Sequence, residues 1–263
     1  SLIARERVDT VVLAYSDLAH TQVMHLASRV VAAGADFVVP GARRTTLRSR
    51  RPVIAVTAVR TGVGKSQTTR YVAALLQSMG LRVVAVRHPM PYGDLAAQTC
   101  QRFETHADLV RHDCTIEERE EYEPHIDAGV VVYAGVDYGA ILREAEAEAD
   151  VVLWDGGNND LPFYVPDLHI VLADPLRPGD EAAFHPGEAN VRMADLVIIA
   201  KCDSATAGDI AAVEASVQAL NPRAEVLRCD SPVTLDDPAA VTGRRVVVVE
   251  DGPTLTHGSM SFG

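Results

Sequence analysis

The sequence has few cysteines, no long apolar run and a deficit of positive charge, and each lack excludes a class of protein. Its four cysteines are widely separated, with no C-x-x-C pair and no regular metal-ligand spacing, so we expect free thiols in a reducing compartment. No apolar run reaches the roughly 18 residues of a membrane span, and no positively charged leader precedes an apolar stretch. These lacks predict a cytoplasmic protein that does not enter a membrane.

The net charge is −12 at pH 7, which argues against nucleic acid or an anionic membrane surface as a general partner. The length of 263 residues, 48% of them hydrophobic, supplies enough material for one large domain or two modest ones. We therefore expect a folded globular protein in which local basic clusters stand out.

Apolar, β-branched runs alternate with helical patterns along the chain. The expected strands are Thr10–Ala14, Phe37–Val39, Val53–Val59, Val83–Val86, Val130–Tyr133, Val151–Trp154, Leu168–Leu172, Leu196–Ala200, Glu225–Arg228 and Val246–Glu250. The clearest helical patterns are Thr21–Ala33, Lys65–Met79, Tyr138–Glu148 and Asp209–Leu220. Apolar strands separated by helices indicate an α/β fold: a mostly parallel sheet with helices on both faces.

A phosphate-binding loop is expected where the strand ending at Val59 runs into "RTGVGKS" and a helical pattern follows. Glycines let backbone N–H groups turn toward phosphate oxygens, Lys65 reaches the β- and γ-phosphates, and Ser66 is a ligand for Mg²⁺. The alternative is a chance glycine turn. The expected nucleotide-binding residues of this segment are Thr61, Gly62, Val63, Gly64, Lys65, Ser66 and Gln67.

The loop departs from G-x-x-x-x-G-K-[ST] in one place, because Val59 stands where the first glycine is usual. The next residue, Arg60, occupies the position of the second lysine in the K-G-G-x-G-K-[ST] loops of MinD-like P-loop proteins. We expect Arg60 to be a catalytic cation that stabilises charge during phosphoryl transfer, as Lys65 does. The alternative is a solvent-facing Arg60.

A second strand supplies the expected metal ligand. The segment "EADVVLWDGGNND" is an apolar strand that ends in Asp155, and the two glycines that follow allow close approach to a γ-phosphate. We assign Asp155 to magnesium binding and catalysis; the alternative is that it only caps a helix.

A third strand bears on the nucleotide base. It ends in "AKCD", and Lys201 and Asp203 fit the [NT]-K-x-D pattern with which GTPases bind guanine. Ala200 does not fit, so the sequence leaves ATP and GTP both open.

Other polar clusters are candidates for metal and for an anionic acceptor. Asp94 is a third candidate metal ligand, and Arg87 and His88 lie after the second strand of the domain, where the γ-phosphate is expected. Arg177 and His185 follow a further strand, where loops of open α/β sheets gather ligands. The acidic segment "TIEEREEYEPHI" is interpreted as a solvated helix start.

A domain boundary is expected in "GARRTTLRSRRP", which carries five arginines and little apolar material. It separates residues 1–48, the C-terminal part of an N-terminal Rossmann-like α/β domain, from residues 49–263, the P-loop NTPase domain. A solvated linker and a basic pocket for a phosphorylated ligand are equal alternatives for the basic segment. The chain lacks an initial methionine and both ends look cut, so we expect truncation at both ends.

Together the motifs resemble those of one family. "VTAVRTGVGKS", "VRHPMPYGDL", "EEREEYEPHI", "VVYAGVDY", "LWDGGNND", "DPLRPG", "HPGE" and "EDGPTLTHG" are similar to the cyclic 2,3-diphosphoglycerate synthetase family, also described as predicted P-loop GTPases, from about Asp9 to the last residue. The resemblance implies an enzyme that uses ATP and Mg²⁺ to close 2,3-diphosphoglycerate into its phosphoanhydride, releasing ADP and phosphate. Arg87, His88, Arg177 and His185 would then bind this acceptor, and pairing across the nucleotide, frequent among deviant-loop relatives, favours a homodimer.

Two other functions compete with the synthetase. Lys201 and Asp203 favour a regulatory or metallochaperone-type GTPase with a protein partner, which Ala200 and the lack of a Cys/His tract weaken. The other alternative is a nucleotide-binding module of a larger protein whose catalytic residues lie in segments outside this chain.

Overall fold

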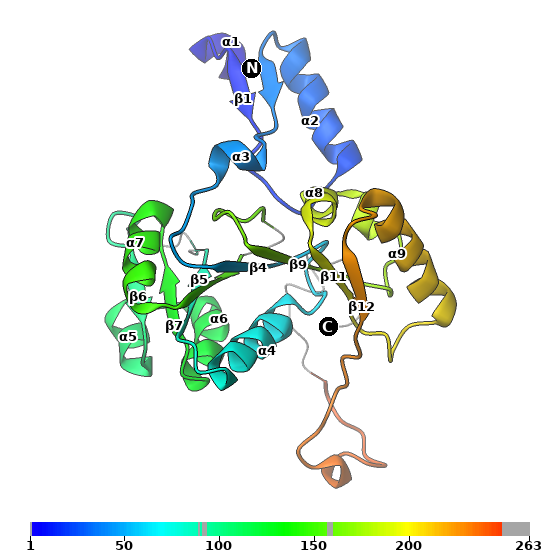
Figure 1. Cartoon of the computed structure of the whole chain (residues 1–263). Coiled ribbons are helices and arrows are strands. Elements are labelled where there is room, and N and C mark those ends of the chain that lie inside the picture. The colour runs from blue at the N-terminus through cyan, green and yellow to red at the C-terminus, as the bar shows by residue number, and fades with distance from the viewer. Residues whose placement is uncertain (1, 89, 91–93, 157–159, 249–263) are drawn as a thin grey trace.

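The computed structural model describes residues 2–88, 90, 94–156 and 160–248, and its centre is an eight-stranded sheet (Figure 1). In order across the sheet the strands are β12 (Glu225–Arg228), β11 (Leu196–Ile199), β9 (Leu168–Ala173), β4 (Val53–Ala58), β8 (Val151–Asp155), β5 (Val83–Arg87), β7 (Val131–Ala134) and β6 (Gln101–Phe103). All neighbours are parallel except β6 and β7, which are antiparallel. The expected α/β class is confirmed.

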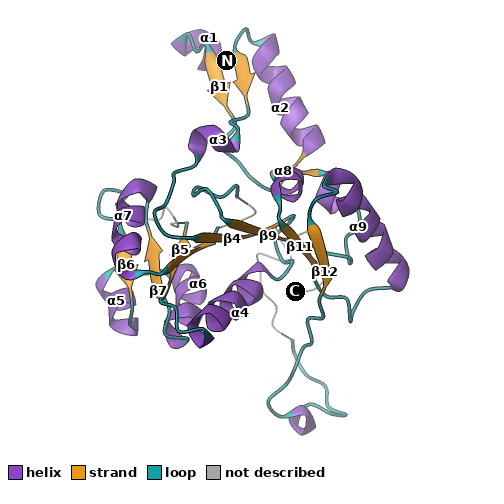
Figure 2. Cartoon of the chain, viewed as in Figure 1, coloured by secondary structure: helices purple, strands orange, loops and turns teal. Residues whose placement is uncertain are grey.

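Helices cover both faces of this sheet (Figure 2). They are α4 (Lys65–Ser78), α5 (His106–Arg111), α6 (Ile116–Asp127), α7 (Tyr138–Glu148), α8 (Gly187–Met193) and α9 (Ala207–Leu220), with short 3₁₀ helices η1 (Asp180–Ala182) and η2 (Pro238–Ala240). Because successive side chains of a strand point to opposite faces, β5 serves two layers. Val83 and Ala85 pack in the cluster that contains α4 and α6, whereas Val84 and Val86 pack in the cluster that contains α7.

The N-terminal segment forms a small separate unit at the top of Figure 1. It contains α1 (Leu2–Glu6), β1 (Thr10–Val12), β2 (Leu18–Ala19), α2 (His20–Ala32), β3 (Asp36–Val38) and α3 (Ala42–Thr45). Strands β1 and β3 are parallel and joined through α2, which confirms a partial α/β unit before the P-loop. Strand β2 pairs antiparallel with β10 (Phe184–His185), which lies between η1 and α8. This pairing joins the N-terminal unit to the large domain.

The basic segment before β4 lies against the large domain. The backbone of Leu47 exchanges hydrogen bonds with Phe163 and Val165 at 2.8 and 2.9 Å, and Arg50 Nε donates to Glu146 of α7 at 2.8 Å. The boundary near residue 48 stays a prediction.

Most of the expected bounds agree with the structure to within two residues, but one expected strand is wrong and the short strands β2, β6 and β10 were not expected. The strand expected at Val246–Glu250 is wrong for residues 246–248, which are irregular and at least half exposed, while the remainder lies outside the described residues. Strand β6 was not expected, because its three residues include two polar ones and it pairs only at the sheet edge. Within the described residues, no helix is both long enough and apolar enough to span a membrane.

We predict that Gly187→Ala destabilises the protein whereas Gly208→Ala does not. A Cβ atom at Gly187 would lie 2.4 Å from the carbonyl oxygen of Val59, but at Gly208 its nearest neighbour would be a side-chain oxygen at 3.7 Å. Forcing α8 away from the end of the P-loop strand should lower the free energy of unfolding by about 1–3 kcal/mol. Denaturant unfolding of both variants measures the difference, and equal stability would contradict the close packing of α8 on Val59.

Candidate nucleotide-binding site

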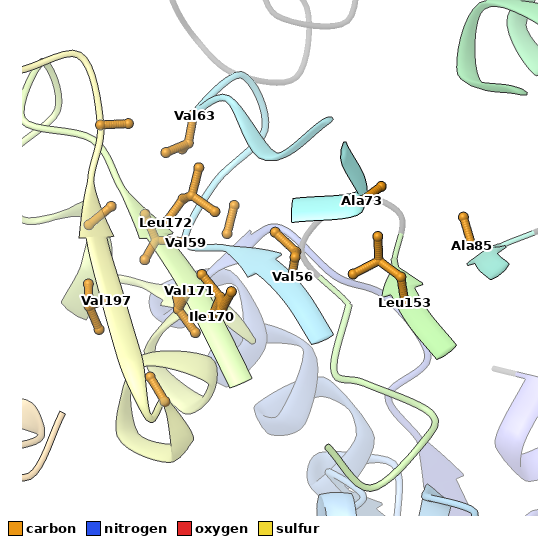
Figure 3. Close-up of a cluster of buried hydrophobic side chains, with 14 of the residues drawn as sticks. Val56, Val59, Val63, Ala73, Ala85, Leu153, Ile170, Val171, Leu172 and Val197 are labelled. Carbon is orange, nitrogen blue, oxygen red and sulfur yellow. The ribbon is translucent and has the colours of Figure 1, made fainter. Parts of the chain in front are cut away.

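The loop predicted to bind phosphate lies between β4 and α4. Gly62 and Gly64 have φ of 80° and 111°, a backbone conformation that residues other than glycine rarely adopt. Val59 is 1% exposed, donates its N–H to Leu172 at 2.9 Å, and packs in the core beside β9 (Figure 3). The valine therefore fills the core at the position where the usual motif has a glycine.

The expected metal ligand Asp155 lies directly beside this loop, because β8 pairs with β4. Its side chain is fully buried, and Oδ1 accepts from Lys65 Nζ at 2.5 Å and from Thr69 Oγ1 at 3.2 Å. Burial alone would raise the pKa of this carboxyl, but the charges of Arg87 and Lys65 outweigh it and hold the pKa well below its usual value. Asp155 is therefore an anion at neutral pH, and Lys65 is its immediate partner.

The other carboxylate oxygen of Asp155 is bound from two further elements. Oδ2 accepts from Arg87 of β5 and lies 3.2 Å from His125 Nε2 of α6. Arg87 also pairs with Glu121, one turn before His125. Neither Glu121 nor His125 was among the residues expected at the site, and the signal in the sequence was their spacing of four, which places them on one face of a helix.

Helix α6 was expected only as a solvated helix start. Thr115 and Glu118 form a capping box: the Glu118 amide donates to Thr115 Oγ1 and the Thr115 amide donates to Glu118 Oε2. Tyr122, His125 and Ile126 are buried, so the helix covers the sheet despite its acidic composition. Its packing brings Glu121 and His125 to the carboxyl edge of β5 and β8.

Arg87 and His88, both expected to bind an anionic acceptor, belong to this cluster, with Arg87 buried and His88 partly buried. Arg87 is 1% exposed and its guanidinium is paired with two carboxylates, those of Asp155 and Glu121. Burial, with the neighbouring Arg87 and Lys65 charges, lowers the pKa of His88 to about 4, so this imidazole is neutral at pH 7. These two residues therefore offer little net positive charge to an acceptor.

Arg60 is buried on the side of the loop that faces the N-terminal unit. It is 4% exposed, with Nε 2.6 Å from Asp17, Nη1 2.9 Å from Asp180, and its guanidinium 3.7 Å from the ring centroid of Phe184. Thr61 Oγ1 also donates to Asp17, at 3.0 Å. A solvent-facing Arg60 is therefore wrong, and its role as a catalytic cation stays a prediction.

Arg177 and Lys201 both contact the backbone of the phosphate-binding loop. Arg177 Nη2 donates to the Thr61 carbonyl at 2.9 Å, and Lys201 Nζ donates to the Gly62 carbonyl at 2.6 Å. Both cations also bind the carboxylate of Asp174, a residue that sequence analysis did not select although it opens the quoted motif "DPLRPG".

Asp203 and His185, the other candidates beyond the loop, have different surroundings. Asp203 is exposed, and its Oδ1 accepts from the Ser231 amide at 2.8 Å. His185 belongs to β10, is partly buried, and has a pKa lowered by burial and by His20. The base-binding and acceptor-binding roles of these residues stay predictions.

The oxygen ligands near the loop fit magnesium. Ser66 lies in the first turn of α4 and Asp155 supplies a carboxylate, and Mg²⁺ prefers such oxygens together with water and substrate phosphates. Asp94 is exposed and its Oδ1 accepts from the Ala96 amide at 2.9 Å. Among the described residues, no three His, Cys, Asp or Glu side chains are grouped to hold a metal ion. Ser66 and Asp155 could hold Mg²⁺ beside a bound nucleotide, and the metal-binding roles of Ser66, Asp155 and Asp94 stay predictions.

We predict that Arg87→Ala strongly destabilises the protein, because it leaves Asp155 buried with one cation fewer. Removing one partner of a buried ion pair costs about 3–5 kcal/mol. Arg102→Ala is the matched control: this arginine pairs with Glu148 at the surface and should cost about 1 kcal/mol or less. Unfolding in urea compares the two, and equal costs would show that the Asp155 cluster does not depend on Arg87.

Comparison with known proteins gives one strong similarity. No protein-family model matches the chain. It is 61% identical over 262 residues to arginine synthetase ArcE of Thermococcus kodakarensis, an alignment that covers all of this chain and 58% of that protein. The chain thus spans less than two thirds of this relative's length.

Solved structures are similar at a lower level. LpxK from Aquifex aeolicus, in complex with ATP, matches with a TM-score of 0.44 and 18% identity over 68% of this chain and 54% of its own. A ParA family ATPase from Chlorobium tepidum matches with a TM-score of 0.38 and 15% identity over 69% of this chain and 85% of its own. Similarities at this level do not assign a function.

Proposed function

Because the chain is homologous over its whole length to part of arginine synthetase ArcE, we propose that it is the nucleotide-binding part of an ATP-dependent synthetase. The observation that carries the proposal is the pairing of Lys65 with Asp155 at the carboxyl edge of the sheet, beside a loop with two left-handed glycines. A lysine, a carboxylate and loop amides are the groups that hold ATP and its magnesium ion for phosphoryl transfer. GTP is the alternative nucleotide, through Lys201 and Asp203.

Nucleotide binding would have to break the contact between Lys65 and Asp155. In this conformation the Lys65 ammonium binds a carboxylate oxygen, and burial lowers its pKa despite that partner. A bound triphosphate would offer the Lys65 ammonium the anionic oxygens of the β- and γ-phosphates in place of Asp155 Oδ1. Oδ1 of Asp155 would then be available to hold magnesium, while Arg87 and His125 keep Oδ2 in place.

For the acceptor, the charges around the site favour a neutral group. The nearby cations are already paired: Arg87 with Asp155 and Glu121, and Arg60 with Asp17 and Asp180. A synthetase that forms arginine would activate a ureido group, which carries no charge. Its oxygen takes the γ-phosphoryl group and ADP leaves; ammonia then attacks the activated carbon and phosphate leaves, giving a guanidinium group. The name of the homologous protein supports this acceptor.

The second candidate is the synthesis of cyclic 2,3-diphosphoglycerate, which the quoted motifs support. In that reaction the γ-phosphoryl group passes to one phosphate of the acceptor, and the other phosphate attacks it intramolecularly. Proximity of two phosphates on adjacent carbons lowers the entropic barrier to this ring closure. An acceptor with about five negative charges needs cations, so Arg87, Arg177 and Lys65 would have to leave carboxylates to bind it. A homodimer remains a proposal that would add cations from a second copy.

The test is phosphate release by the full-length protein with Mg²⁺ and ATP or GTP, supplied with either the ureido precursor of arginine plus ammonia or 2,3-diphosphoglycerate. We expect ATP turnover that requires the ureido compound and ammonia, with arginine detected by mass spectrometry. A cyclic anhydride in the phosphorus NMR spectrum would establish the second candidate instead. Acceptor-independent turnover that prefers GTP would contradict both and indicate a regulatory GTPase.

We predict that Lys65→Ala lowers this turnover by roughly 100-fold or more, because it removes a cation that contacts the transferring phosphoryl group. Arg70→Ala, which removes a cation five residues further along α4, is the matched control and should retain turnover. Circular dichroism checks that both variants remain folded. Turnover that survives Lys65→Ala would rule out the assignment of the loop.

A further inference from the structure

Charged residues that follow two strands of the sheet, β9 and β11, lie beside the phosphate-binding loop that follows β4. Strand β4 runs into the loop, β9 beside it ends just before Asp174, and β11 on the far side of β9 ends just before Lys201. Parallel strands bring the residues that follow them to the same sheet edge. Asp174 and Lys201 therefore lie beside the loop as a consequence of strand order.

Asp174 is buried and lies at the centre of this group. It is 2% exposed; Oδ2 accepts from Arg177 Nη2 at 2.9 Å and from Lys201 Nζ at 3.4 Å, and Oδ1 accepts from the Leu176 amide at 3.0 Å. A buried carboxylate with two cations fixes the position of both. Each cation then reaches one carbonyl of the loop.

The two carbonyls belong to consecutive peptide groups. Arg177 Nη2 lies 2.9 Å from the Thr61 oxygen, and Lys201 Nζ lies 2.6 Å from the Gly62 oxygen. In a planar trans peptide the carbonyl and the following N–H point in opposite directions. Holding these two oxygens toward the cations therefore turns the N–H groups of Gly62 and Val63 to the opposite side of the loop, where phosphate oxygens bind.

Lys201 adopts a backbone conformation that is unfavourable for its residue type. Its φ is +55°, a left-handed value that glycine or asparagine adopts at lower cost. Such strain persists where the surroundings over-determine the conformation. A lysine at this position is explained by what its side chain contacts, the Gly62 carbonyl and Asp174.

We propose that Asp174 is a positioning residue for nucleotide binding, which acts through Arg177 and Lys201 to orient the amides of Gly62 and Val63 toward phosphate. This role is an alternative to the acceptor-binding role expected for Arg177 and the base-binding role expected for Lys201, both of which stay predictions. The proposal rests on the proposed nucleotide site and does not depend on which acceptor the protein uses. Because the oriented amides would bind the phosphate chain, the identity of the base should not change the contribution of Asp174 to binding.

The test compares ATP with inorganic tripolyphosphate, which has the phosphates and no base, by isothermal titration calorimetry on the full-length protein. We expect Lys201→Ala and Asp174→Asn each to weaken binding by about 10- to 100-fold, the range expected when a hydrogen bond to a charged group is lost. The loss should be the same for ATP, GTP and tripolyphosphate. In the double variant the losses should not add, because both act on the same loop carbonyls.

Asp167→Asn is the matched control, because the Asp167 carboxylate also binds a backbone amide, that of Val53, but at the opposite end of β4. It should leave tripolyphosphate binding unchanged. Should Asp174→Asn fail to fold, Lys201→Ala alone decides the outcome.

Two results would overturn the proposal. If Lys201→Ala weakens binding of ATP or GTP but not of tripolyphosphate, Lys201 contacts the base and does not orient the loop. Unchanged binding of all three ligands by both variants would mean that the loop amides hold their orientation without this group. Failure of the natural protein to bind any of the three ligands is a different result, which overturns the proposed nucleotide site and with it this inference.

Discussion

The buried carboxylate of Asp155 is the charge on which the arrangement of the site depends. An isolated ionised carboxylate costs far too much to bury, so it must be matched by donors. The donors come from three elements, Lys65 and Thr69 of α4, Arg87 of β5 and His125 of α6. This one anion therefore fixes the start of α4 and the position of α6 against the sheet, and it makes the predicted metal ligand the centre of the packing. Any gain of magnesium at Asp155 must be accompanied by the loss of one of these donors, and Lys65 is the donor with an alternative partner in the nucleotide.

Two charge clusters lie on either side of the phosphate-binding loop, and in each of them two cations surround one buried carboxylate. On one side Lys65 and Arg87 surround Asp155, and on the other Arg177 and Lys201 surround Asp174. In both clusters the carboxylate is fully or almost fully buried, so the cations are held by a partner that water does not reach. Positive charge is therefore used to fix the loop and the metal ligand, and less of it is left to attract a highly charged acceptor. This distribution is the physical reason for favouring a neutral acceptor over 2,3-diphosphoglycerate.

The parts of the site that are built from consecutive residues could be predicted from the sequence. The strand before Val59, the left-handed glycines and the helix beginning at Lys65 follow one another, and the apolar strand before Asp155 ends where its carboxylate is needed. Contacts between distant segments could not be predicted in the same way. Glu121 and His125 look like part of a solvated acidic helix until the packing of α6 is known, and nothing in the sequence shows that Arg177 and Lys201 share the carboxylate of Asp174. The polarity of these residues is visible in the sequence, but their partners depend on strand order.

The two departures of the loop from the usual motif have one structural explanation. Val59 packs inward directly after β4 ends at Ala58, its N–H donates to the Leu172 carbonyl, and its own carbonyl lies against Gly187 of α8. Arg60 then points toward the N-terminal unit, where Asp17 forms an ion pair with Arg60 and accepts a hydrogen bond from Thr61 Oγ1. Because the Arg60 guanidinium is almost fully buried, moving the N-terminal unit away from the loop would leave a buried cation short of one carboxylate and remove the side-chain partner of Thr61. The unusual residues thus connect the predicted phosphate-binding loop to a second structural unit, so a movement of the N-terminal unit would break contacts of the loop.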